Sequence, residues 1–234
     1  MTYKNCLLAA VFLTFFASIA VAQSQRTDIH LDANDVQPLL PGMQASAFEV
    51  FSVEGQSVHF DPENMQKPLV LTFFRGGWCP YCNLHLAELR KAESELKELG
   101  FDIWFISIDR PELLYDSLEQ PDIGYTVLSD SGLEATRAFG LAFRVTDETV
   151  VRYKTYNIDL EAASGKSHHV LPAPSTYIIA SDGMIRFQYT NPDYAVRLHP
   201  DVLLAAARAY DDEVNDRLRR QHKAKKEAKS STGG

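Results

Sequence analysis

Cysteine is scarce in this sequence, which contains only three in 234 residues. Cys6 lies in the first apolar run, so the rest of the chain holds only the pair Cys79 and Cys82. Zinc would require a second pair of ligands, and His168 and His169 form the only other cluster. Otherwise these two histidines are expected on the surface, with a proton-relay role near the thiols as the alternative. A purely structural disulfide across so short a loop would constrain the unfolded chain little. Both of these uses of the cysteine pair are therefore disfavoured.

The sequence also lacks an apolar run long enough for a membrane span. The run from Leu7 to Ala20 is shorter than the roughly 20 residues that a bilayer-crossing helix needs. It follows Lys4 and leads to Ala20-Val21-Ala22, which gives the positive start, apolar centre and small-residue cleavage site of an export signal. We expect residues 1–22 to be a cleaved signal peptide, with an uncleaved anchor as the alternative. The mature protein would then be periplasmic or secreted, without stable membrane insertion.

An excess of positive charge is missing as well, because the net charge is −8 at pH 7. Basic residues gather between Arg217 and Lys229, so the chain before them is more acidic than the total suggests. An acidic body argues against nucleic acid as a partner. The basic tail, residues 213–234, is expected to be a solvated, frayed helix end or a disordered segment.

No internal repeat divides the chain. About 212 residues remain after residue 22, and this length favours one domain with embellishments. Residues 23–44 are polar and mixed, as a lead-in segment would be. Residues 45–212 are expected to form the folded domain, and the 45% hydrophobic content of the chain supplies material for its core.

The most informative stretch begins with the apolar run Leu69 to Phe74, which is typical of a buried parallel strand. The run ends in a turn at Gly76-Gly77. After the turn, apolar residues recur at steps of three and four, which predicts an amphipathic helix ending at Gly100. These residues are Cys82, Leu86, Leu89, Ala92, Leu96 and Leu99. Cys79 should therefore lie where a strand ends and a helix begins.

That position has chemical consequences for Cys79. The first N–H groups of a helix lack intrahelical partners and carry partial positive charge, so they stabilise a thiolate. The pKa of Cys79 should fall below the free value of about 8.5. Pro80 suits the first helical position. Cys82 lies one turn on, at a spacing that a small adjustment closes into a disulfide. We expect Cys79 to be the exposed, attacking sulfur and Cys82 the deeper, resolving one.

The segment Trp78-Cys79-Pro80-Tyr81-Cys82 resembles a thioredoxin active site, with the Pro-Tyr pair of glutaredoxins between the cysteines. The flanking sequence resembles the peroxiredoxin-like proteins of the alkyl hydroperoxide reductase and thiol-specific antioxidant family. Later segments are similar to that family in the same order: Ile106-Ser107-Ile108-Asp109, Val127-Leu128-Ser129-Asp130 with Ala138-Phe139-Gly140, and Ser175 to Gly183. The resemblance covers about Ala45 to Tyr210.

The order of expected elements matches the fold that this resemblance implies. They are a hairpin over Ala45 to Phe60, the Cys strand and helix, a strand over Phe101 to Asp109, a short helix to Gln120, a strand over Tyr125 to Ser129, a helix over Leu133 to Phe139, a helix over Thr146 to Tyr156, a polar loop over Glu161 to His169, strands over Tyr177 to Ala180 and Met184 to Tyr189, and a closing helix over Pro200 to Arg220. This predicts an α/β thioredoxin fold, a central mixed sheet flanked by helices, with an N-terminal β-hairpin extension and an insertion before Pro174.

Three side chains near the site carry further expectations. Pro174 corresponds by place to the cis-proline that faces the cysteines in thioredoxin folds, with an ordinary trans proline as the alternative. Asp109 should lie at the same sheet end as Cys79, where capping the following helix is the favoured role. His85 is expected to be solvent-exposed. The resemblance implies substrate contacts by Trp78, Pro80, Tyr81 and Pro174.

The chain departs from the peroxiredoxin pattern in two places. The family motif Pro-x-x-x-Thr-x-x-Cys would require Pro where Thr72 stands and Thr where Gly76 stands. The family arginine before the hairpin strand is replaced by Pro174. Because those groups polarise the peroxide, fast peroxidase chemistry would need a substitute, and Arg75 or Arg144 could provide it by geometry.

The sequence therefore predicts an enzyme with a Cys79/Cys82 dithiol–disulfide cycle. Its substrate would be a peroxide, which converts Cys79 to a sulfenic acid, or a disulfide, which Cys79 attacks directly. Both routes need an external thiol as electron donor, and neither implies a metal or organic cofactor. The alternative from another class is a redox-inactive binding module, which the intact cysteine pair argues against.

Overall fold

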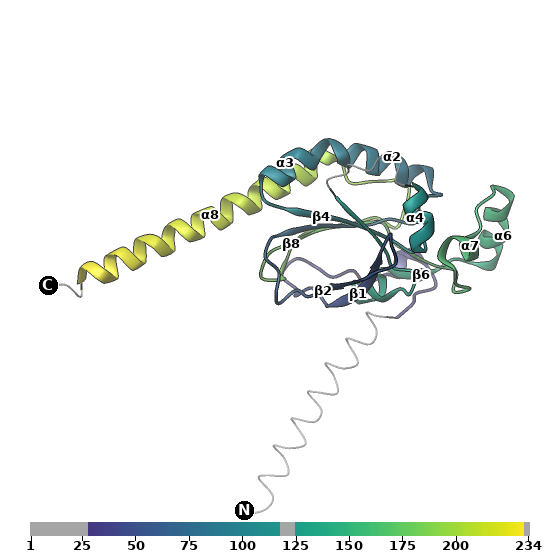
Figure 1. Cartoon of the computed structure of the whole chain (residues 1–234), viewed down its shortest axis with the longest axis horizontal. Coiled ribbons are helices and arrows are strands. Elements are labelled where there is room, and N and C mark those ends of the chain that lie inside the picture. Colours follow the sequence, from purple (N-terminus) through teal and green to yellow (C-terminus); the bar gives the residue numbers. More distant parts are fainter. Residues whose placement is uncertain (1–27, 118–124, 232–234) are drawn as a thin grey trace, which may run out of the picture.

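The computed structural model describes residues 28–117 and 125–231 (Figure 1). The predicted signal peptide, residues 1–22, lies outside these ranges. Among the described residues, no helix combines the length and the apolar character that a membrane span requires. The central element is a seven-stranded sheet with the order β2-β1-β5-β4-β3-β8-β9.

The strands of this sheet are β1 (Phe48–Ser52), β2 (Ser57–Phe60), β3 (Leu69–Phe73), β4 (Asp102–Ser107), β5 (Thr126–Ser129), β8 (Ser175–Ile179) and β9 (Ile185–Thr190). β3, β4 and β5 are parallel, whereas β1 pairs antiparallel with β5, and β8 pairs antiparallel with β3 and β9. The mixed sheet and the N-terminal hairpin β1–β2 confirm the predicted fold class.

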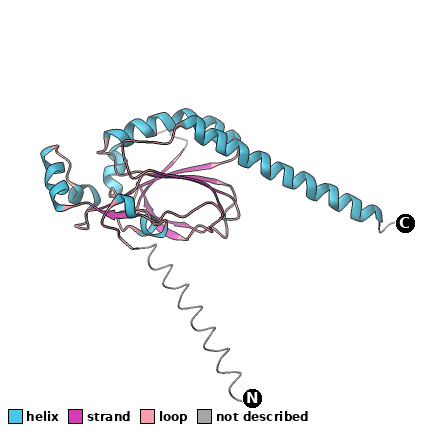
Figure 2. Cartoon of the chain, turned by 180° about the vertical axis from the view of Figure 1, so that it is seen from behind, coloured by secondary structure: helices cyan, strands magenta, loops and turns pink. Residues whose placement is uncertain are grey.

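Helices cover one face of the sheet. They are α2 (Pro80–Leu89), η2 (Arg90–Ala92), α3 (Glu93–Glu98), α4 (Pro111–Ser117) and the start of α8 (Pro200–Ser231). In Figures 1 and 2, α2, α3 and the first turns of α8 lie side by side above the sheet. Their apolar side chains form a core cluster with the sheet, and this cluster includes both Cys79 and Cys82. The dithiol is therefore part of a packed layer.

The other face packs against the hairpin, the segment before it and the short helix α5 (Glu134–Ala138). Aromatic rings dominate this second cluster. Phe139 contacts Phe48, Phe73 and Tyr177, with ring centroids 5.0–5.9 Å apart. Asp130 accepts hydrogen bonds from the backbone N–H groups of Ala135 and Thr136 at 3.0 and 2.7 Å, and so stabilises the start of α5. The sheet is thus buried on both faces where the site is built.

The sequence predicts a single helix after Cys79, whereas the structure has three consecutive elements, α2, η2 and α3. The apolar period does continue from Cys82 to Leu99, but the backbone changes to a 3-10 turn over η2 before α3 begins. Ala92 in this turn is completely buried. The tighter turn changes the backbone without moving the apolar stripe away from the sheet, which explains why the periodicity did not indicate it.

The insertion before Pro174 contains β6 (Ala142–Arg144), α6 (Asp147–Thr155), α7 (Leu160–Ser164) and β7 (Val170–Pro172). The predicted helix over Thr146 to Tyr156 is confirmed, with the Thr146 side chain accepting from the Thr149 N–H. The predicted polar loop over Glu161 to His169 is wrong in its first part, which is α7. Asp159 caps that helix, and Gly165 ends it at a φ of 68°.

The prediction that Pro174 is cis is wrong, because no cis peptide bond occurs in the described parts of the chain. The backbone runs extended from β7 into β8 through Ala173 and Pro174. Ala173 donates to the Leu141 carbonyl at 2.9 Å, and the Pro174 carbonyl accepts from Asn191 at 3.2 Å. A trans bond is compatible with this extended path between two paired strands.

The closing helix α8 begins at Pro200, as predicted, and continues to Ser231. Its packing residues lie at its start, where Leu203 and Ala207 are buried and Leu204 and Tyr210 are partly buried. Its second half extends away from the body in both views (Figures 1 and 2). From the sequence, residues 213–234 are expected to be a frayed helix end or a disordered segment. The structure has them helical as far as Ser231.

Candidate active site

The turn that presents Cys79 is held by backbone and carboxylate contacts. Cys79 N–H donates to the Gly76 carbonyl at 3.1 Å, and Gly77 N–H donates to Asp109 Oδ2 at 2.6 Å. At Gly76, a Cβ would come within 2.3 Å of the Trp78 indole nitrogen and 2.7 Å of Asp109 Oδ1. Only glycine fits between those two groups. Gly76, which stands at the family's threonine position, therefore cannot be replaced by a residue with a side chain unless its neighbours move.

Cys79 is the N-cap of α2, and Pro80 occupies the first helical position, as the sequence predicts. The thiol pKa is lowered to about 6. The largest cause is a hydrogen bond from the Cys82 side chain, and the Cys82 N–H, Arg75 and Arg197 lower it further against the opposing effect of burial. A thiolate therefore predominates at neutral pH, which is the reactive form of the group.

The two sulfurs are both free and both buried. The expectation that Cys79 is exposed is wrong, since it is only 2% exposed. Trp78 and Tyr81, its neighbours along the chain, line the cavity above it. Hydrogen bonding to Cys79 raises the pKa of Cys82, and burial raises it further. Cys79 is thus the thiolate and Cys82 the thiol that donates to it.

Arg75 carries a positive charge into this buried region. Its side chain is 3% exposed, donates to the Tyr153 hydroxyl, and has a buried Nε without a hydrogen-bond partner. The guanidinium lies 5.2 Å from the Trp78 ring centroid, 5.6 Å from Tyr153 and 4.1 Å from Tyr194. Three aromatic rings therefore hold the cation beside the thiolate.

Of the two arginines that the sequence offered as substitutes, Arg75 lies at the site. Arg144 instead donates to the His168 carbonyl at 2.8 Å in the insertion. His168 accepts from the Val170 N–H, and His169 pairs with Glu161 at 2.9 Å. These contacts place the two histidines in the insertion, and neither lines the cavity beside Cys79.

Asp109 lies at the sheet end of Cys79, as expected from the parallel strands. The favoured helix-capping role is not the one its carboxylate serves, because Oδ2 binds the turn at Gly77. Burial raises the pKa of Asp109 to about 6, and the nearby Cys79 charge contributes in the same direction. Oδ1 is buried without a hydrogen-bond partner. The residue holds the turn, and its carboxyl group interacts electrostatically with the Cys79 charge.

Sequence reasoning missed Arg197, which donates from Nη2 to Cys82 Sγ at 3.2 Å. It lies between β9 and α8, in a segment without any motif. The sequence-based expectation that His85 is solvent-exposed is also wrong. His85 is 4% exposed and contacts the Leu198 carbonyl through Nε2 at 3.1 Å. His85 follows Cys82 by one turn, so it shares the buried face of α2, and burial lowers its pKa to about 4.

A cavity of about 520 Å³ opens beside Cys79. Its walls come from the turn, from α6 and the residues after it, and from the segment before α8. The lining residues are Arg75, Trp78, Cys79, Pro80, Tyr81, Arg152, Tyr153, Tyr156, Ile158 and Tyr194. Three of the four predicted substrate-contacting residues, Trp78, Pro80 and Tyr81, are thus together. Pro174 is buried and is not part of this wall.

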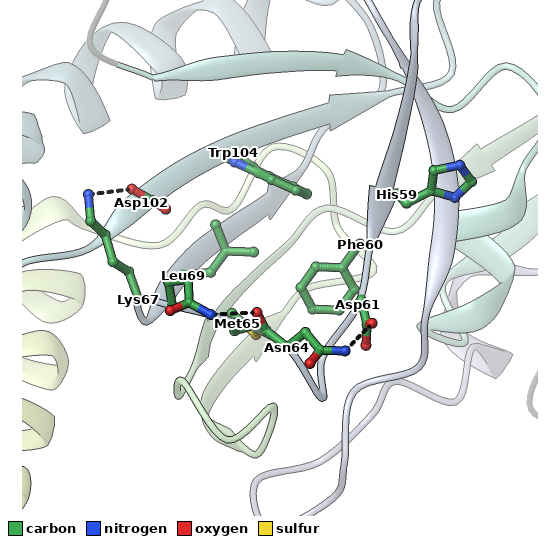
Figure 3. Close-up of a pocket in the computed structure, with 10 residues that line it drawn as sticks. His59, Phe60, Asp61, Asn64, Met65, Lys67, Leu69, Asp102 and Trp104 are labelled. Carbon is green, nitrogen blue, oxygen red and sulfur yellow. Dashed lines mark hydrogen bonds and ion pairs between the residues drawn. The ribbon is translucent and has the colours of Figure 1, made fainter.

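A second, smaller cavity of about 200 Å³ lies between the segment after β2 and strand β4 (Figure 3). Phe60, Leu69 and Trp104 form its apolar part, and Lys67 pairs with Asp102 at its edge at 3.4 Å. It contains no cysteine. Among the described residues, no cluster of histidine, cysteine and carboxylate side chains could hold a metal ion. Cys79 lines the larger cavity beside α2 and not this one.

The sequence is similar to a known protein family and to individual thiol-dependent enzymes. The model of the AhpC/TSA family matches residues 41–188. Peroxiredoxin Bcp of Escherichia coli K12 is 28% identical over 169 residues, which cover 72% of this chain and 96% of that protein. Thiol-disulfide oxidoreductase ResA of Halalkalibacterium halodurans is 27% identical over 101 residues, 43% of this chain and 56% of ResA.

Solved structures show the same fold at lower identity. Peroxidoxin BcpB from Mycobacterium tuberculosis superposes with a TM-score of 0.55 at 20% identity, covering 72% of this chain and 96% of that one. The thiol peroxidase from Chromobacterium violaceum gives a TM-score of 0.58 at 11% identity, covering 79% of this chain and 98% of that one.

Proposed function

The chain belongs to the AhpC/TSA family, and we propose that Cys79 and Cys82 are its redox centre, cycling between dithiol and disulfide. It is a peroxiredoxin-like protein with a thioredoxin fold and a thiol-dependent oxidoreductase. The observation that carries the proposal is the Cys79 thiolate, with its pKa near 6, at the start of α2 and in a cavity wall with Cys82 beside it.

In the peroxide route, the Cys79 thiolate attacks one oxygen of ROOH. The O–O bond breaks, Cys79 becomes a sulfenic acid, and the leaving alkoxide takes a proton to give ROH. The family's threonine and arginine are absent, and Arg75 supports the reaction in their place. Its charge stabilises the thiolate, and the guanidinium would also stabilise the negative charge on the departing oxygen. Because this is one group where the family has two, we expect slow peroxide turnover.

In the second route, Cys79 attacks a disulfide and Cys82 resolves the mixed disulfide, releasing the second thiol. Two arguments favour this route. The dithiol alone is sufficient for the reaction, and one similar protein, ResA, is named as a thiol-disulfide oxidoreductase. Both routes end in a Cys79–Cys82 disulfide, which an external thiol donor must reduce. We propose that this cycle runs outside the cytoplasm, supported by the export signal in residues 1–22.

The routes can be compared by mixing the reduced protein with one equivalent of hydrogen peroxide, cumene hydroperoxide or a small disulfide, and following the loss of two thiols. We expect competent exchange and slower peroxide reduction. Cys82→Ser should then accumulate a mixed disulfide on Cys79 with the disulfide substrate and a persistent sulfenic acid with peroxide, each identified by mass spectrometry.

Oxidation by peroxide far faster than that of a free thiolate would establish the peroxidase as the main activity. A protein in which neither substrate consumes the two thiols would contradict the redox proposal and favour a binding module. Export is tested separately, by N-terminal sequencing of protein from the extracytoplasmic fraction. A mature chain that begins at Gln23 is expected, whereas an intact Met1 in the cytosol would contradict it.

A further inference from the structure

Cys82 has a charged neighbour that the chemistry described so far does not use. Arg197 Nη2 donates to Cys82 Sγ at 3.2 Å. The other two guanidinium nitrogens, Nε and Nη1, are buried and have no hydrogen-bond partner among the described residues. No ion pair with a carboxylate is found for Arg197 in the part of the chain that the structure describes. Its charge is therefore directed to the sulfur and not neutralised by an acidic side chain.

The helix that carries Cys82 also holds Arg197 in place. His85, one turn after Cys82, contacts the carbonyl of Leu198 at 3.1 Å, and the Leu198 side chain is 3% exposed in the core. The residue after Arg197 is thus fixed to α2 through both its backbone and its side chain. This arrangement positions the guanidinium over the second sulfur.

The electrostatics of Cys82 change between the two halves of the cycle. In the reduced protein, the Cys82 thiol donates a hydrogen bond to the Cys79 thiolate, and a second negative sulfur beside the first would be unfavourable. Once Cys79 is bonded to oxygen or to a second sulfur, its negative charge is gone. Arg197 is then the charge in contact with Cys82.

We propose that Arg197 is a catalytic residue of the second step, which binds the Cys82 sulfur as it becomes a thiolate and attacks Cys79. The proposal rests on the dithiol cycle. With a sulfenic acid, Cys82 sulfur bonds to Cys79 sulfur, the S–O bond breaks, and hydroxide leaves with the Cys82 proton as water. With a mixed disulfide, the same S–S bond forms, the substrate thiolate leaves, and the Cys82 proton passes to solvent.

Other groups near the dithiol are less suited to this role. Arg75 is held by three aromatic rings and acts on Cys79. Asp109 is acidic and interacts with Cys79, and His85 is buried with its pKa lowered to about 4, so it is neutral at pH 7. Arg197 also lies beyond residues 41–188, where the family model matches. It is a feature of this chain that the matched region does not include.

The two steps can be resolved with 5,5′-dithiobis(2-nitrobenzoate), whose coloured thiolate is released once by each. Attack by Cys79 releases the first equivalent, and closure of the Cys79–Cys82 disulfide releases the second. Stopped-flow absorbance with a small excess of protein gives both rates across pH 5–9. The reagent is a disulfide, so the measurement does not depend on peroxidase activity.

Arg197→Met removes the charge with a side chain of similar length. We expect the first phase to change by less than about threefold and the second to slow by about tenfold or more, consistent with loss of one charge contact to an ionising group. The second phase should also move to higher pH, which a merely structural change would not produce. Arg197→Lys should recover part of the rate, because a lysine keeps the charge but not the planar fork.

Arg208→Met is the matched control, since it removes an equal charge from the exposed pair with Glu95 and should leave both phases unchanged. Cys82→Ser should show the first phase only. A second phase of wild-type rate and pH profile in folded Arg197→Met would overturn the proposal. If Arg197→Met is unfolded by circular dichroism, Arg197→Gln, which also lacks the charge but keeps polar hydrogen-bonding groups, decides: a second phase identical to wild type overturns the proposal, and a slowed one supports it. Absence of the second phase in the wild type would instead contradict the dithiol cycle itself.

Discussion

Arg75 places a positive charge in an almost closed aromatic enclosure next to the reactive thiol. In water this charge would contribute little to the thiolate, but burial weakens solvent screening and strengthens the interaction. Arg75 is therefore the side chain outside the dithiol whose removal should change Cys79 most directly.

We predict that Arg75→Met raises the pKa of Cys79 from about 6 towards the ordinary thiol value. The rate of alkylation by iodoacetamide at pH 6.5 should fall about three- to tenfold, because a smaller fraction of the thiol is ionised. The measurement is the pH profile of alkylation followed by mass spectrometry. Arg144→Met, which changes an arginine of the insertion, is the control. An unchanged pH profile in Arg75→Met would show that the guanidinium does not act on Cys79.

Single residues differ in how far sequence could place them. Cys79, Cys82 and Pro80 were found because a strand, a turn and a helix surround them in a continuous stretch. Arg197 was missed because its contact with Cys82 joins positions 115 residues apart, and nothing local marks it. The exposed position expected for Cys79 was wrong for a related reason, since α6 and the segment before α8 cover the site from elsewhere in the chain.

At the scale of elements, the start of α2 concentrates the chemistry, and its buried face connects that start to the segment before α8. His85 makes this connection. Because the ring is buried, protonation below its ordinary range would place an uncompensated charge in the core, beside Arg197. Acid should thus loosen the contact between α2 and the segment that covers it.

We predict that His85 makes the protein less stable as the pH falls. Its folded-state pKa of about 4 is below the unfolded value of 6.5, so its contribution is fully present above pH 6.5 and is lost as the pH falls towards 4. Relative to His85→Gln, which keeps a donor for the Leu198 carbonyl, the wild type should lose about 2–3 kcal/mol of unfolding free energy over this window.

Urea unfolding of both proteins at several pH values between 4 and 7.5 measures this difference. His59→Gln, a change at an exposed histidine, should follow the wild type. A difference between wild type and His85→Gln that does not vary with pH would refute the expected linkage.

Most strands and helices could be predicted, because apolar residues recur at regular spacing within each continuous segment. The β1–β2 hairpin, β3, β4 and α6 all follow such patterns. β6 and β7 have only three residues each, too few for a period, and they pair with each other across the insertion. The same lack of a local signal explains α7 within an expected loop, and the trans bond at Pro174, which depends on the extended path between β7 and β8.

At the scale of the molecule, the body is a sheet buried on both faces, and the long helix α8 extends away from it (Figures 1 and 2). The packing residues of α8 lie between Leu203 and Tyr210, so the helix is anchored by its first turns. The basic residues that follow Arg217 give the projecting part a charge opposite to that of the body. The stability of the fold should therefore depend on the beginning of α8 and hardly on residues 213–234.

We predict that a chain ending at Asp212 keeps its melting temperature within about 3 °C, the range expected for a loss below 1 kcal/mol. Cys79 should alkylate with an unchanged pH profile. Leu203→Ala in the full chain, by contrast, removes a buried side chain and should cost about 2–4 kcal/mol. Thermal melting by circular dichroism compares the three proteins. A large drop in the truncated chain would mean that the projecting helix packs on the body.

The cavity beside Cys79 takes its walls from separate places in the chain. The dithiol and its turn follow β3, the aromatic wall of Tyr153 and Tyr156 comes from α6 and the residue after it, and Tyr194 comes from the segment before α8. The shape of the entrance can therefore change through two peripheral segments without a change in the turn that carries Cys79. For protein engineering, exchanging these two segments between relatives would change the walls of the cavity while keeping the proposed redox centre.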